Sequence, residues 1–311
     1  MIDVSPKFNT LRWAKATGVL RTSNEIIQRV KNNKVPKGNV LEVARAAGIL
    51  AAKKTAEWIV FCHPIPLDWV EVMFELHEDK IEVFSEVKSI QKTGVEMEAL
   101  TAVQAALMNM YDMLKPLTGD LMMTDIKLLD KKGGKSDFKD AFSPKLTAGV
   151  VVISDSTYQG KRTDKSGKII KEFLENTGQI EVREYIIVPD NREKIESTVK
   201  SLTDDKKLHL VFTTGGTGFG PKDITFEAVS PLLERTAPGI AETIRRHGKE
   251  RTPYAMLSRE IAGTRGDSVI ITLPGSSKGA KESLEALFPG LLHIYPMMWG
   301  GGHTKDGKAK L

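Results

Sequence analysis

The sequence has few of the residues on which disulfide-rich, zinc-binding or membrane proteins depend. Cysteine occurs once, as Cys62, which excludes an intrachain disulfide and a zinc site made of several thiolates. The six histidines show neither HExxH nor HxxxH spacing, which argues against a helical zinc site. No apolar run reaches the ~18 residues of a membrane span, and the first ten residues lack a signal peptide's apolar stretch. We therefore expect a cytoplasmic protein without a membrane partner.

A large excess of one charge is also missing. Lys and Arg total 45 and Asp and Glu total 40, which gives a net charge of +5. Residues 1–144 contribute +1 of this charge and residues 145–311 contribute +4. A protein that coats nucleic acid needs clustered basic residues, so we expect no nucleic-acid partner. A mild positive charge suits small anionic substrates better. The 311 residues, 41% of them hydrophobic, suffice for two globular domains, with one large α/β domain as the alternative.

The first part of the sequence combines helical and alternating patterns. Apolar and polar residues alternate over 68–76, which predicts a half-buried strand. The turn HEDK joins this strand to a second alternating stretch over 81–88, so the two form a hairpin. Further elements are predicted as helices over 24–33, 41–59 and 98–114 and as a strand over 123–129. The mixture predicts an α+β domain with an antiparallel sheet.

A polar stretch over 139–147, which contains Pro144, precedes a different pattern. The continuous apolar run AGVVVIS is typical of a parallel strand covered on both faces. Strands are predicted over 148–154, 183–189, 208–214 and 268–274, and helices over 166–176, 192–202 and 281–295. This alternation predicts a doubly wound, mostly parallel α/β sheet. The sequence thus predicts domains at 1–143 and 144–311, with a flexible tail over 300–311.

Polar and glycine residues gather at the predicted carboxyl ends of these strands, where open α/β sheets bind ligands. They are Asp155, Asp164, Asp190, Gly215, Gly216, Thr217, Gly218, Asp223 and Ser276. Glycines let backbone amides approach an anion, and the helix after Ser276 offers further amides. Carboxylates repel bound phosphates unless Mg²⁺ bridges the two, so this set of residues points to nucleotide chemistry with Mg²⁺. An Asp after a strand is also a common turn former, but four strand ends carry such residues at once.

Residues ~145–300 resemble the molybdopterin-binding family of molybdenum-cofactor biosynthesis, the MoaB/MogA type. The shared segments are VVISDS, DKSG, VPD, TTGGTG, PKDITFEAV, APG, LSRE and LPGSSKG. The resemblance implies adenylylation of molybdopterin with ATP and Mg²⁺. It implies that Asp190 and Asp223 are catalytic and bind the metal. It implies a substrate cradle of Asp155, Gly215, Gly216, Thr217, Gly218, Ser258 and Ser276. Lys222 and Phe226 stand where Arg and Pro are common; the lysine keeps the charge for phosphate binding but loses the planar fork. The family also contains MoaB-type members without an established adenylyl transfer, so binding of molybdopterin without catalysis remains an alternative.

Three features of the first part invite a catalytic interpretation. Lys53 and Lys54 precede a rigid His63-Pro64 turn, and two carboxylates, Glu96 and Glu98, open an apolar helix. Asp112 and Lys115 are spaced i, i+3 near the end of that helix, so both can face one site. Each feature also has a structural explanation, since charges at helix ends favour the macrodipole and an exposed pair contributes only ~0.3 kcal/mol.

Residues 1–138 resemble the cyclic pyranopterin monophosphate synthase family (MoaC). The shared segments are IDVS, KGNVLEVARAAGI, AAKKT, CHPIPL, KTGVEMEALTAV, MYDMLK and GGKS. The resemblance implies a ferredoxin-like fold and conversion of 3′,8-cyclo-7,8-dihydro-GTP to cyclic pyranopterin monophosphate with loss of pyrophosphate. It implies catalytic roles for Asp112, Lys115, His63, Glu96 and Glu98, and substrate binding by Arg12, Lys37, Lys53, Cys62 and Lys135. We expect a lowered pKa for Lys115 because other cations lie nearby.

The two resemblances together describe a fusion of two enzymes of one pathway. The first family forms hexamers with sites at subunit interfaces and the second commonly forms trimers, so a threefold homo-oligomer, a trimer or hexamer, satisfies both. The two steps are not consecutive, which gives no reason to expect direct channelling, although contact with other enzymes of the pathway is possible. The small molecules expected to bind are the cyclised GTP intermediate, molybdopterin and ATP.

Overall fold

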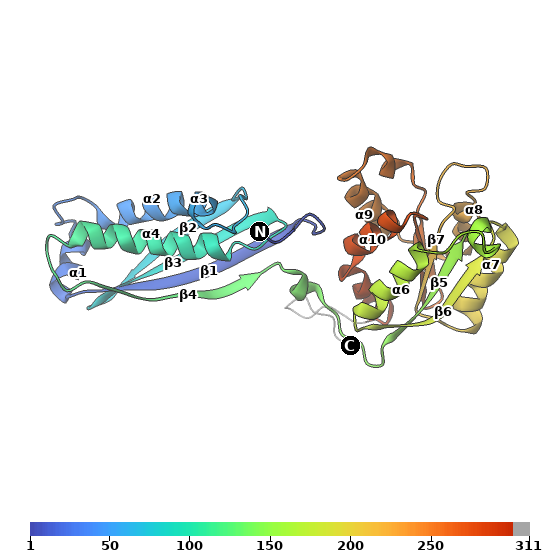
Figure 1. Ribbon diagram of the computed structural model, residues 1–311. Helices are drawn as coiled ribbons and strands as arrows, with labels where there is room; N and C mark the ends of the chain where they lie inside the picture. The colour runs from blue at the N-terminus through green and yellow to red at the C-terminus, as the bar shows by residue number, and fades with distance from the viewer. Residues whose placement is uncertain (301–311) are drawn as a thin grey trace. The chain divides into compact units, whose positions relative to one another are not determined.

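The computed structural model describes residues 1–300 and contains two compact units, Met1–Asp137 and a second that begins at Phe138. Figure 1 shows the chain coloured from its N-terminus. The flexible tail predicted over 300–311 lies, beyond Gly300, outside the described residues. No helix within residues 1–300 has the length and apolar character that a membrane span requires.

The first unit is an antiparallel four-stranded sheet with helices along one face (Figure 1). Its strands are β1 (Thr10–Arg21), β2 (Trp69–Leu76), β3 (Lys80–Gln91) and β4 (Met122–Lys132). Its helices are α1 (Asn24–Lys31), α2 (Val40–Lys53), α3 (Thr55–Trp58) and α4 (Glu96–Leu114). The strand order is β2-β3-β1-β4, and each neighbouring pair is antiparallel. The predicted hairpin and antiparallel α+β organisation are therefore confirmed.

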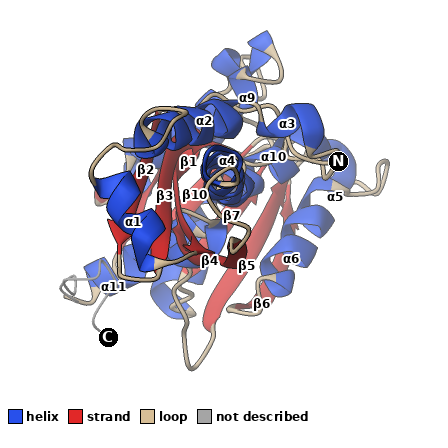
Figure 2. Ribbon diagram, turned by 90° about the vertical axis from the view of Figure 1, so that its left-hand side faces the viewer, coloured by secondary structure: helices blue, strands red, loops and turns tan. Residues whose placement is uncertain are grey.

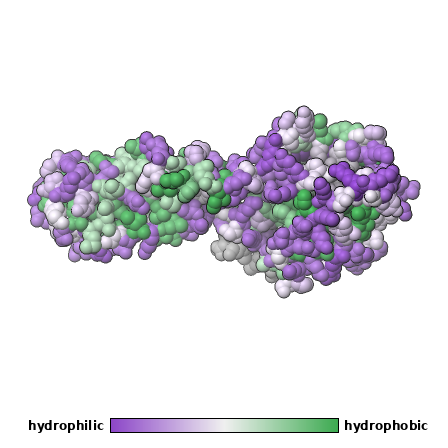
Figure 3. All heavy atoms as spheres, viewed as in Figure 1, coloured by the Kyte–Doolittle hydropathy of each residue, from purple (hydrophilic) through white to green (hydrophobic). Residues whose placement is uncertain are grey.

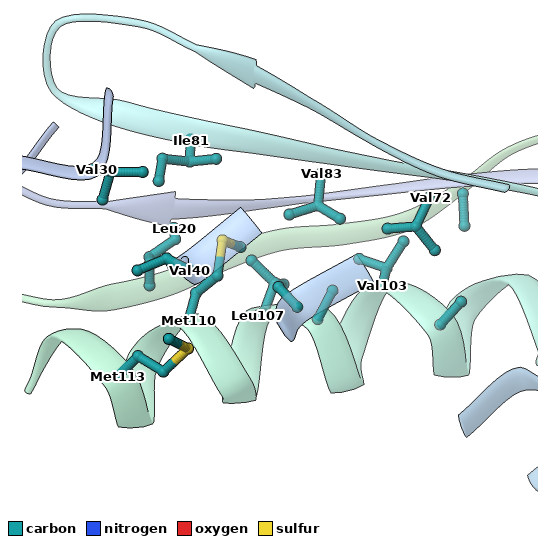
Figure 4. Packing of buried hydrophobic residues seen from close by; sticks show 14 of the residues in the cluster. Leu20, Val30, Val40, Val72, Ile81, Val83, Val103, Leu107, Met110 and Met113 are labelled. Atoms are coloured by element: carbon teal, nitrogen blue, oxygen red, sulfur yellow. The ribbon is translucent and has the colours of Figure 1, made fainter. Parts of the chain in front are cut away.

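The core of this unit lies between α4 and the central strands, where Figure 4 shows Leu107, Met110 and Val103 facing the sheet. Strand β1 was not predicted from the sequence. Its inward residues include Ala14, Ala16 and Gly18, which are too small to produce a strong apolar alternation. Their size is required by packing, because a Cβ at Gly18 would lie 2.7 Å from Val103 Cγ1. Helix α4 thus packs directly on the β1 backbone.

The second unit is a six-stranded sheet of order β6-β5-β7-β10-β9-β8. Its strands are β5 (Leu146–Ile153), β6 (Ile180–Val188), β7 (Leu210–Thr214), β8 (Arg235–Thr236), β9 (Ala262–Arg265) and β10 (Ser268–Leu273). Its helices are α5 (Asp155–Tyr158), α6 (Ser166–Asn176), α7 (Arg192–Lys200), α8 (Thr225–Val229), α9 (Pro238–Lys249), α10 (Ser277–Leu287) and α11 (Ile294–Met298). Strands β6, β5, β7 and β10 are parallel, and β9 and β8 extend the sheet antiparallel.

Helices cover both faces of this sheet (Figures 1 and 2). Val150 of β5 packs in a core with residues of α6, α9 and α10, whereas Val151 packs in a second core with residues of α7 and α8. All eight residues of β5 are buried, as its continuous apolar run predicts. The mostly parallel, doubly wound class is confirmed. Helix α9 and the antiparallel strands β8 and β9 were not predicted.

Candidate functional site

A pocket of about 400 Å³ lies at the carboxyl edge of the parallel strands in the second unit. The ends of β5, β6, β7 and β10 contribute Ser154, Asp190, Gly215, Gly216, Gly275 and Ser276 to its wall. Asp223, Arg162 and Lys165 add charged side chains to the lining. Residues from four separate strand ends therefore meet in one hollow, because parallel strands present all their carboxyl ends at the same edge.

The turn after β7 requires glycine at two positions, because neighbouring parts of the chain lie too close for a side chain. Gly215 has φ +107°, and a Cβ there would lie 2.2 Å from the carbonyl oxygen of Ile153. Gly216 has φ +62°, and a Cβ there would lie 2.4 Å from Thr225 Oγ1. Thr225 fixes the turn, since its hydroxyl donates to the carbonyl oxygen of Gly215 at 2.7 Å. The turn presents bare backbone to the pocket, the arrangement an anion needs for close approach.

Asp155 and Asp190 hold each other across the ends of β5 and β6. The backbone N–H of Asp155 donates to Asp190 Oδ2 at 2.8 Å, and the backbone N–H of Asp190 donates to Asp155 Oδ1 at 3.1 Å. Burial and the nearby charges of Asp155 and Asp223 raise the pKa of Asp190. The ion pair with Lys222 lowers the pKa of Asp155. Carboxylate oxygens are ligands that Mg²⁺ prefers, but Asp155, Asp190 and Asp223 do not bring their oxygens close enough together to form one ligand group in this structure.

Asp164 has a structural role that the sequence left open. Its carboxylate accepts from the backbone N–H of Gly167 and of Lys168, both at 3.1 Å, and from the Tyr185 hydroxyl. Asp164 therefore caps the first turn of α6 at the wall of the pocket. Arg162 and Lys165, on the same segment, were missed by the sequence analysis. Lys165 belongs to the DKSG segment and Arg162 lies just before it, and only the fold shows that both reach the pocket.

A second, smaller pocket of about 210 Å³ adjoins the first at Ser276, which lines both. Its wall includes Ser258 and the buried Glu260, whose carboxylate pairs with Arg245 Nη1 at 3.4 Å. Ser276 also caps α10, because its Oγ accepts from the Gly279 N–H at 3.1 Å. Thr217 contacts Ser258, Oγ to Oγ, at 3.3 Å. Thr217 and Ser258 thus lie by the second pocket and not in the wall of the first.

In the first unit, a pocket of about 380 Å³ lies beside the start of α4. Lys53, His63 and Glu98 line it. Glu98 is 5% exposed, and burial raises its pKa to about 7, with a smaller contribution from the neighbouring charge of Glu96. Burial and Glu98 also raise the pKa of the Cys62 thiol, which keeps it protonated. His63 Nε2 lies 3.0 Å from the carbonyl oxygen of Ile2.

A second group of charges lies at the same end of α4. Lys131 Nζ pairs with Glu96 Oε1 at 2.8 Å. Burial opposes ionisation of Glu96, but this ion pair and a backbone hydrogen bond lower its pKa overall. Arg12 is buried and donates from Nε to the carbonyl oxygen of Gln91 at 3.1 Å. Lys131 was missed by the sequence analysis, because a lysine on an exposed edge strand has no distinguishing pattern.

Asp112 stands at the other end of α4 between two cations. Lys37 Nζ lies 2.7 Å from its Oδ2, and Lys115 Nζ lies 2.8 Å from its Oδ1. The two lysines lower the pKa of Asp112 to about 2, first through Lys115. Asp112 in turn raises the pKa of Lys115. The expected lowering for Lys115 is therefore wrong for this chain, because the nearest charge is a carboxylate and not a cation.

The two charged groups of the first unit are far apart. Helix α4 has 19 residues, and at about 1.5 Å per residue Asp112 lies roughly 20 Å along the axis from Glu98. Lys37, predicted to bind substrate with Lys53, lies at the Asp112 end, where its Nζ donates to Asp112 Oδ2 at 2.7 Å. A single chain thus brings Lys53, His63 and Glu98 together at one end and Lys37, Asp112 and Lys115 together at the other, but does not join the two ends.

Comparisons with known proteins agree with this two-part organisation. The MoaC family matches residues 1–134, and the probable molybdopterin binding domain matches residues 149–293. The Molybdenum cofactor biosynthesis bifunctional protein of Chlorobaculum tepidum is 39% identical over 98% of this chain and 96% of its own length. The Cyclic pyranopterin monophosphate synthase of Aquifex aeolicus is 43% identical over 65% of this chain and 76% of its own. The crystal structure of the molybdopterin biosynthesis enzyme MoaB from Thermus thermophilus is 42% identical, with a TM-score of 0.48, over 50% of this chain and 97% of that one. The chain belongs to the family of molybdenum cofactor biosynthesis bifunctional proteins.

Proposed function

We propose that the two units carry out two separate steps of molybdenum cofactor biosynthesis. The first unit is a cyclic pyranopterin monophosphate synthase, and the second binds molybdopterin. In detail, we infer that the first unit converts 3′,8-cyclo-7,8-dihydro-GTP to cyclic pyranopterin monophosphate and releases pyrophosphate. The observation that carries this reaction is the buried Glu98 beside His63 in a pocket with cations at its edge.

Each charged group of the first unit has a role that follows from its surroundings. Glu98, with a pKa of about 7, can give and take a proton near neutral pH. Lys115, whose pKa the ion pair raises, starts the cycle protonated and acts as the proton donor, while Asp112 holds it in place. Arg12, Lys53, Lys131 and Lys135 are suited to the triphosphate, since charged donors hold phosphate oxygens strongly. Glu96 orients Lys131.

We further propose that this active site is completed between subunits. The two ends of α4 cannot meet in one chain, whereas a neighbouring chain can bring its Asp112 end to the Glu98 pocket. Figure 3 shows apolar residues, in green, over much of the visible face of the first unit. Its exposed apolar side chains include Leu50, Trp58, Met108, Met122 and Leu129. Exposed apolar side chains support contact with another chain, and we propose that the chain forms a homo-oligomer, a trimer or hexamer.

The assay for the first unit follows product formation from the cyclised GTP intermediate by the full chain. Asp112→Ala and Lys115→Ala are expected to lose turnover by at least ~100-fold, the usual contribution of a positioned acid or base. Arg29→Ala is the control, because this arginine makes an exposed ion pair with Glu25 on α1 and lies outside both the pocket and the Asp112 group. Wild-type turnover in both site variants would remove their catalytic assignment.

For the second unit, we propose that molybdopterin is adenylylated with ATP. The 400 Å³ pocket takes the nucleotide and the 210 Å³ pocket takes the pterin, with Ser276 between them. Asp190 and Asp223, which both line the larger pocket, would hold Mg²⁺, and the metal would neutralise phosphate charge at the reacting centre. The amides of the glycine turn and of α10 orient the phosphates, and Arg162 and Lys165 balance their charge. Glu260, buried and acidic, suits the amino and amide N–H groups of a pterin.

Incubation of the full chain with molybdopterin, ATP and Mg²⁺ tests this step. We expect adenylylated molybdopterin and pyrophosphate, with loss of product in Asp190→Asn and in Asp223→Asn. The second candidate is a domain that only binds molybdopterin, which Lys222 and Phe226 favour because they depart from the family's common Arg and Pro. Measurable molybdopterin binding without any adenylylated product would establish that candidate and refute the adenylylation proposal.

Two structural assignments complete the proposal. We infer a ferredoxin-like fold for the first unit, supported by its β-α-β-β-α-β succession and its strand order β2-β3-β1-β4. We also propose functional domains at 1–143 and 144–311, close to the compact units that divide after Asp137. Limited proteolysis is expected to cut first between residues 138 and 146. A first cut inside α4 or β5 would refute the boundary.

A further inference from the structure

Arg259 holds the two ends of the loop that carries Asp223. Its Nε donates to the carbonyl oxygen of Gly218 at 2.8 Å, and its Nη2 donates to the carbonyl oxygen of Asp223 at 2.5 Å. Its backbone N–H donates to the carbonyl oxygen of Thr217 at 2.8 Å. One residue, far away in the sequence, therefore binds the backbone on both sides of the segment 218–223.

The guanidinium itself is fixed from several sides. It lies 5.2 Å from the ring centroid of Phe219 and 5.8 Å from that of Phe226, distances at which cation–π attraction operates. Its Nη1 pairs with the carboxylate of Glu227 on α8. Phe226, which departs from the family's common proline, thus has a contact that explains its presence. The guanidinium is thus held by two aromatic rings and by three hydrogen-bond acceptors.

Within the loop, the carboxylate of Asp223 is enclosed by backbone. Its Oδ2 accepts from the Gly220 N–H at 2.8 Å. A Cβ at Gly218 would lie 2.7 Å from Asp223 Oδ2, and one at Gly220 would lie 2.8 Å from it. The loop is therefore wound tightly around the side chain, and the direction of that side chain depends on where Arg259 holds the loop.

We propose that Arg259 is a positioning residue that prepares the loop 217–223, and through it Asp223, for the Mg²⁺-bound phosphates of the nucleotide. This inference rests on the proposed nucleotide site. The guanidinium N–H groups of Arg259 donate to oxygens of the protein, so Arg259 acts through the loop and not on the substrate. Lysine cannot replace it, because an ammonium on a flexible stem has no planar fork to bridge two carbonyls and stack on a ring.

The test compares Arg259→Lys with Arg265→Lys in the full chain. Arg265 is the matched control, since it pairs with Asp204 at 2.7 Å and donates to the Leu232 carbonyl, and it lines none of the pockets described. In the ligand-free chain we expect amide hydrogen exchange over residues 215–224 to accelerate ~10-fold in Arg259→Lys and to stay unchanged in Arg265→Lys, as loss of a charged hydrogen bond predicts. Unchanged exchange in β5 and β10 shows that the unit remains folded.

Binding provides the second measurement. We expect the Kd of Mg·ATP, measured by calorimetry, to rise ~10-fold in Arg259→Lys while the Kd of molybdopterin changes little. Equal exchange and equal Mg·ATP affinity in Arg259→Lys and wild type would overturn the inference. So would an equal loss of both ligands, which indicates a general structural role. If wild type fails to bind Mg·ATP, the proposed nucleotide function fails, while the exchange comparison still decides whether Arg259 orders the loop.

Discussion

The ammonium of Lys222 lies 2.5 Å from Oδ2 of Asp155, directly beside the acidic group at the carboxyl edge of the second sheet. The Lys222 side chain is 74% exposed. Asp155 also accepts from the backbone N–H of Asp190. Without a ligand, Lys222 thus supplies the positive charge that Asp155 and its acidic neighbours need, in the region where we propose that Mg²⁺ and phosphates bind.

Lys222→Ala is therefore expected to change the binding of the two ligands in opposite directions. Mg²⁺ alone should bind ~3-fold more tightly, since an exposed ion pair contributes less than about 1 kcal/mol and its cation no longer competes. Mg·ATP should bind less tightly, because the same cation is then unavailable to phosphate. Calorimetric titrations with MgCl₂ and with Mg·ATP measure both.

Lys281→Ala controls for a general change in charge, because this exposed lysine pairs with Glu285 one turn along α10. It should leave both affinities unchanged. Weaker Mg²⁺ binding and unaltered Mg·ATP binding in Lys222→Ala would contradict the proposal that Lys222 pairs with Asp155 in the ligand-free chain and with phosphate when Mg·ATP binds.

Gly215→Ala and Gly266→Ala separate backbone strain from steric exclusion. Both positions have positive φ, but nothing lies within 4 Å of a Cβ at Gly266, whereas one at Gly215 meets the Ile153 carbonyl oxygen at 2.2 Å. Gly266→Ala should cost ~1 kcal/mol of unfolding free energy. Gly215→Ala should cost ~3 kcal/mol and abolish Mg·ATP binding, because strands β5 and β7 must separate to admit the methyl group. Scanning calorimetry measures the stabilities, and equal losses in the two variants would refute the steric explanation.

Sequence patterns predicted best those elements whose own residues determine them. The buried run of β5 and the hairpin of β2 and β3 have an apolar period that needs no knowledge of the rest of the fold. Strand β1 could not be found in this way. Ala14, Ala16 and Gly18 are small because α4 lies against them, and that contact joins segments far apart in the sequence. The small residues of β1 are thus explained by its packing against α4 and not by its own apolar pattern.

The same distinction holds for the candidate sites. Asp190 and the glycine turn follow strands directly, so parallel topology alone brings them to one edge. Arg259 and Lys131 act through partners that only tertiary structure supplies. The pKa of Lys115 was predicted with the wrong sign for a similar reason. The sequence shows that cations are near, but not that the carboxylate of Asp112 is nearest.

Glu98→Gln is expected to change how the stability of the first unit depends on pH. The pKa of Glu98 is about 7 in the folded chain against 4.5 for an ordinary Glu. Its protonated form is favourable to the fold below pH 4.5, and this contribution is lost as the pH rises through 7, because the buried carboxylate must then ionise. We therefore compare the free energy of unfolding of Glu98→Gln with that of wild type at two pH values. Relative to wild type, the variant should be up to ~3 kcal/mol more stable at pH 8 than it is at pH 4.5.

Urea unfolding followed by tryptophan fluorescence in a Trp299→Phe background measures this difference. The remaining tryptophans, Trp13, Trp58 and Trp69, all belong to the first unit. Glu57→Gln is the control, since its exposed carboxylate lies beside the same pocket. A pH-independent difference between Glu98→Gln and wild type would show that the carboxyl of Glu98 does not carry the shifted proton.

Mixing of inactive variants decides whether two chains share the active site of the first unit. Asp112→Ala removes a group from one end of α4, and Glu98→Gln removes a group from the other, roughly 20 Å away. If each site takes one end from each of two chains, an equal mixture contains sites in which both ends are intact. Random assembly then restores about one quarter of wild-type turnover before selection, and about one third in a trimer that is selected to contain both variants. Co-expression of differently tagged chains, followed by purification on both tags, provides the mixed oligomer.

A mixture of Asp112→Ala with Lys115→Ala supplies the matched control. Both substitutions lie at the same end of the helix, so every site in that mixture receives one damaged end whichever chains assemble. No turnover should return. Recovery in the first mixture and none in the second requires that the proton donor and the buried carboxyl come from different chains, because a site made within one chain leaves every chain in either mixture with a defect.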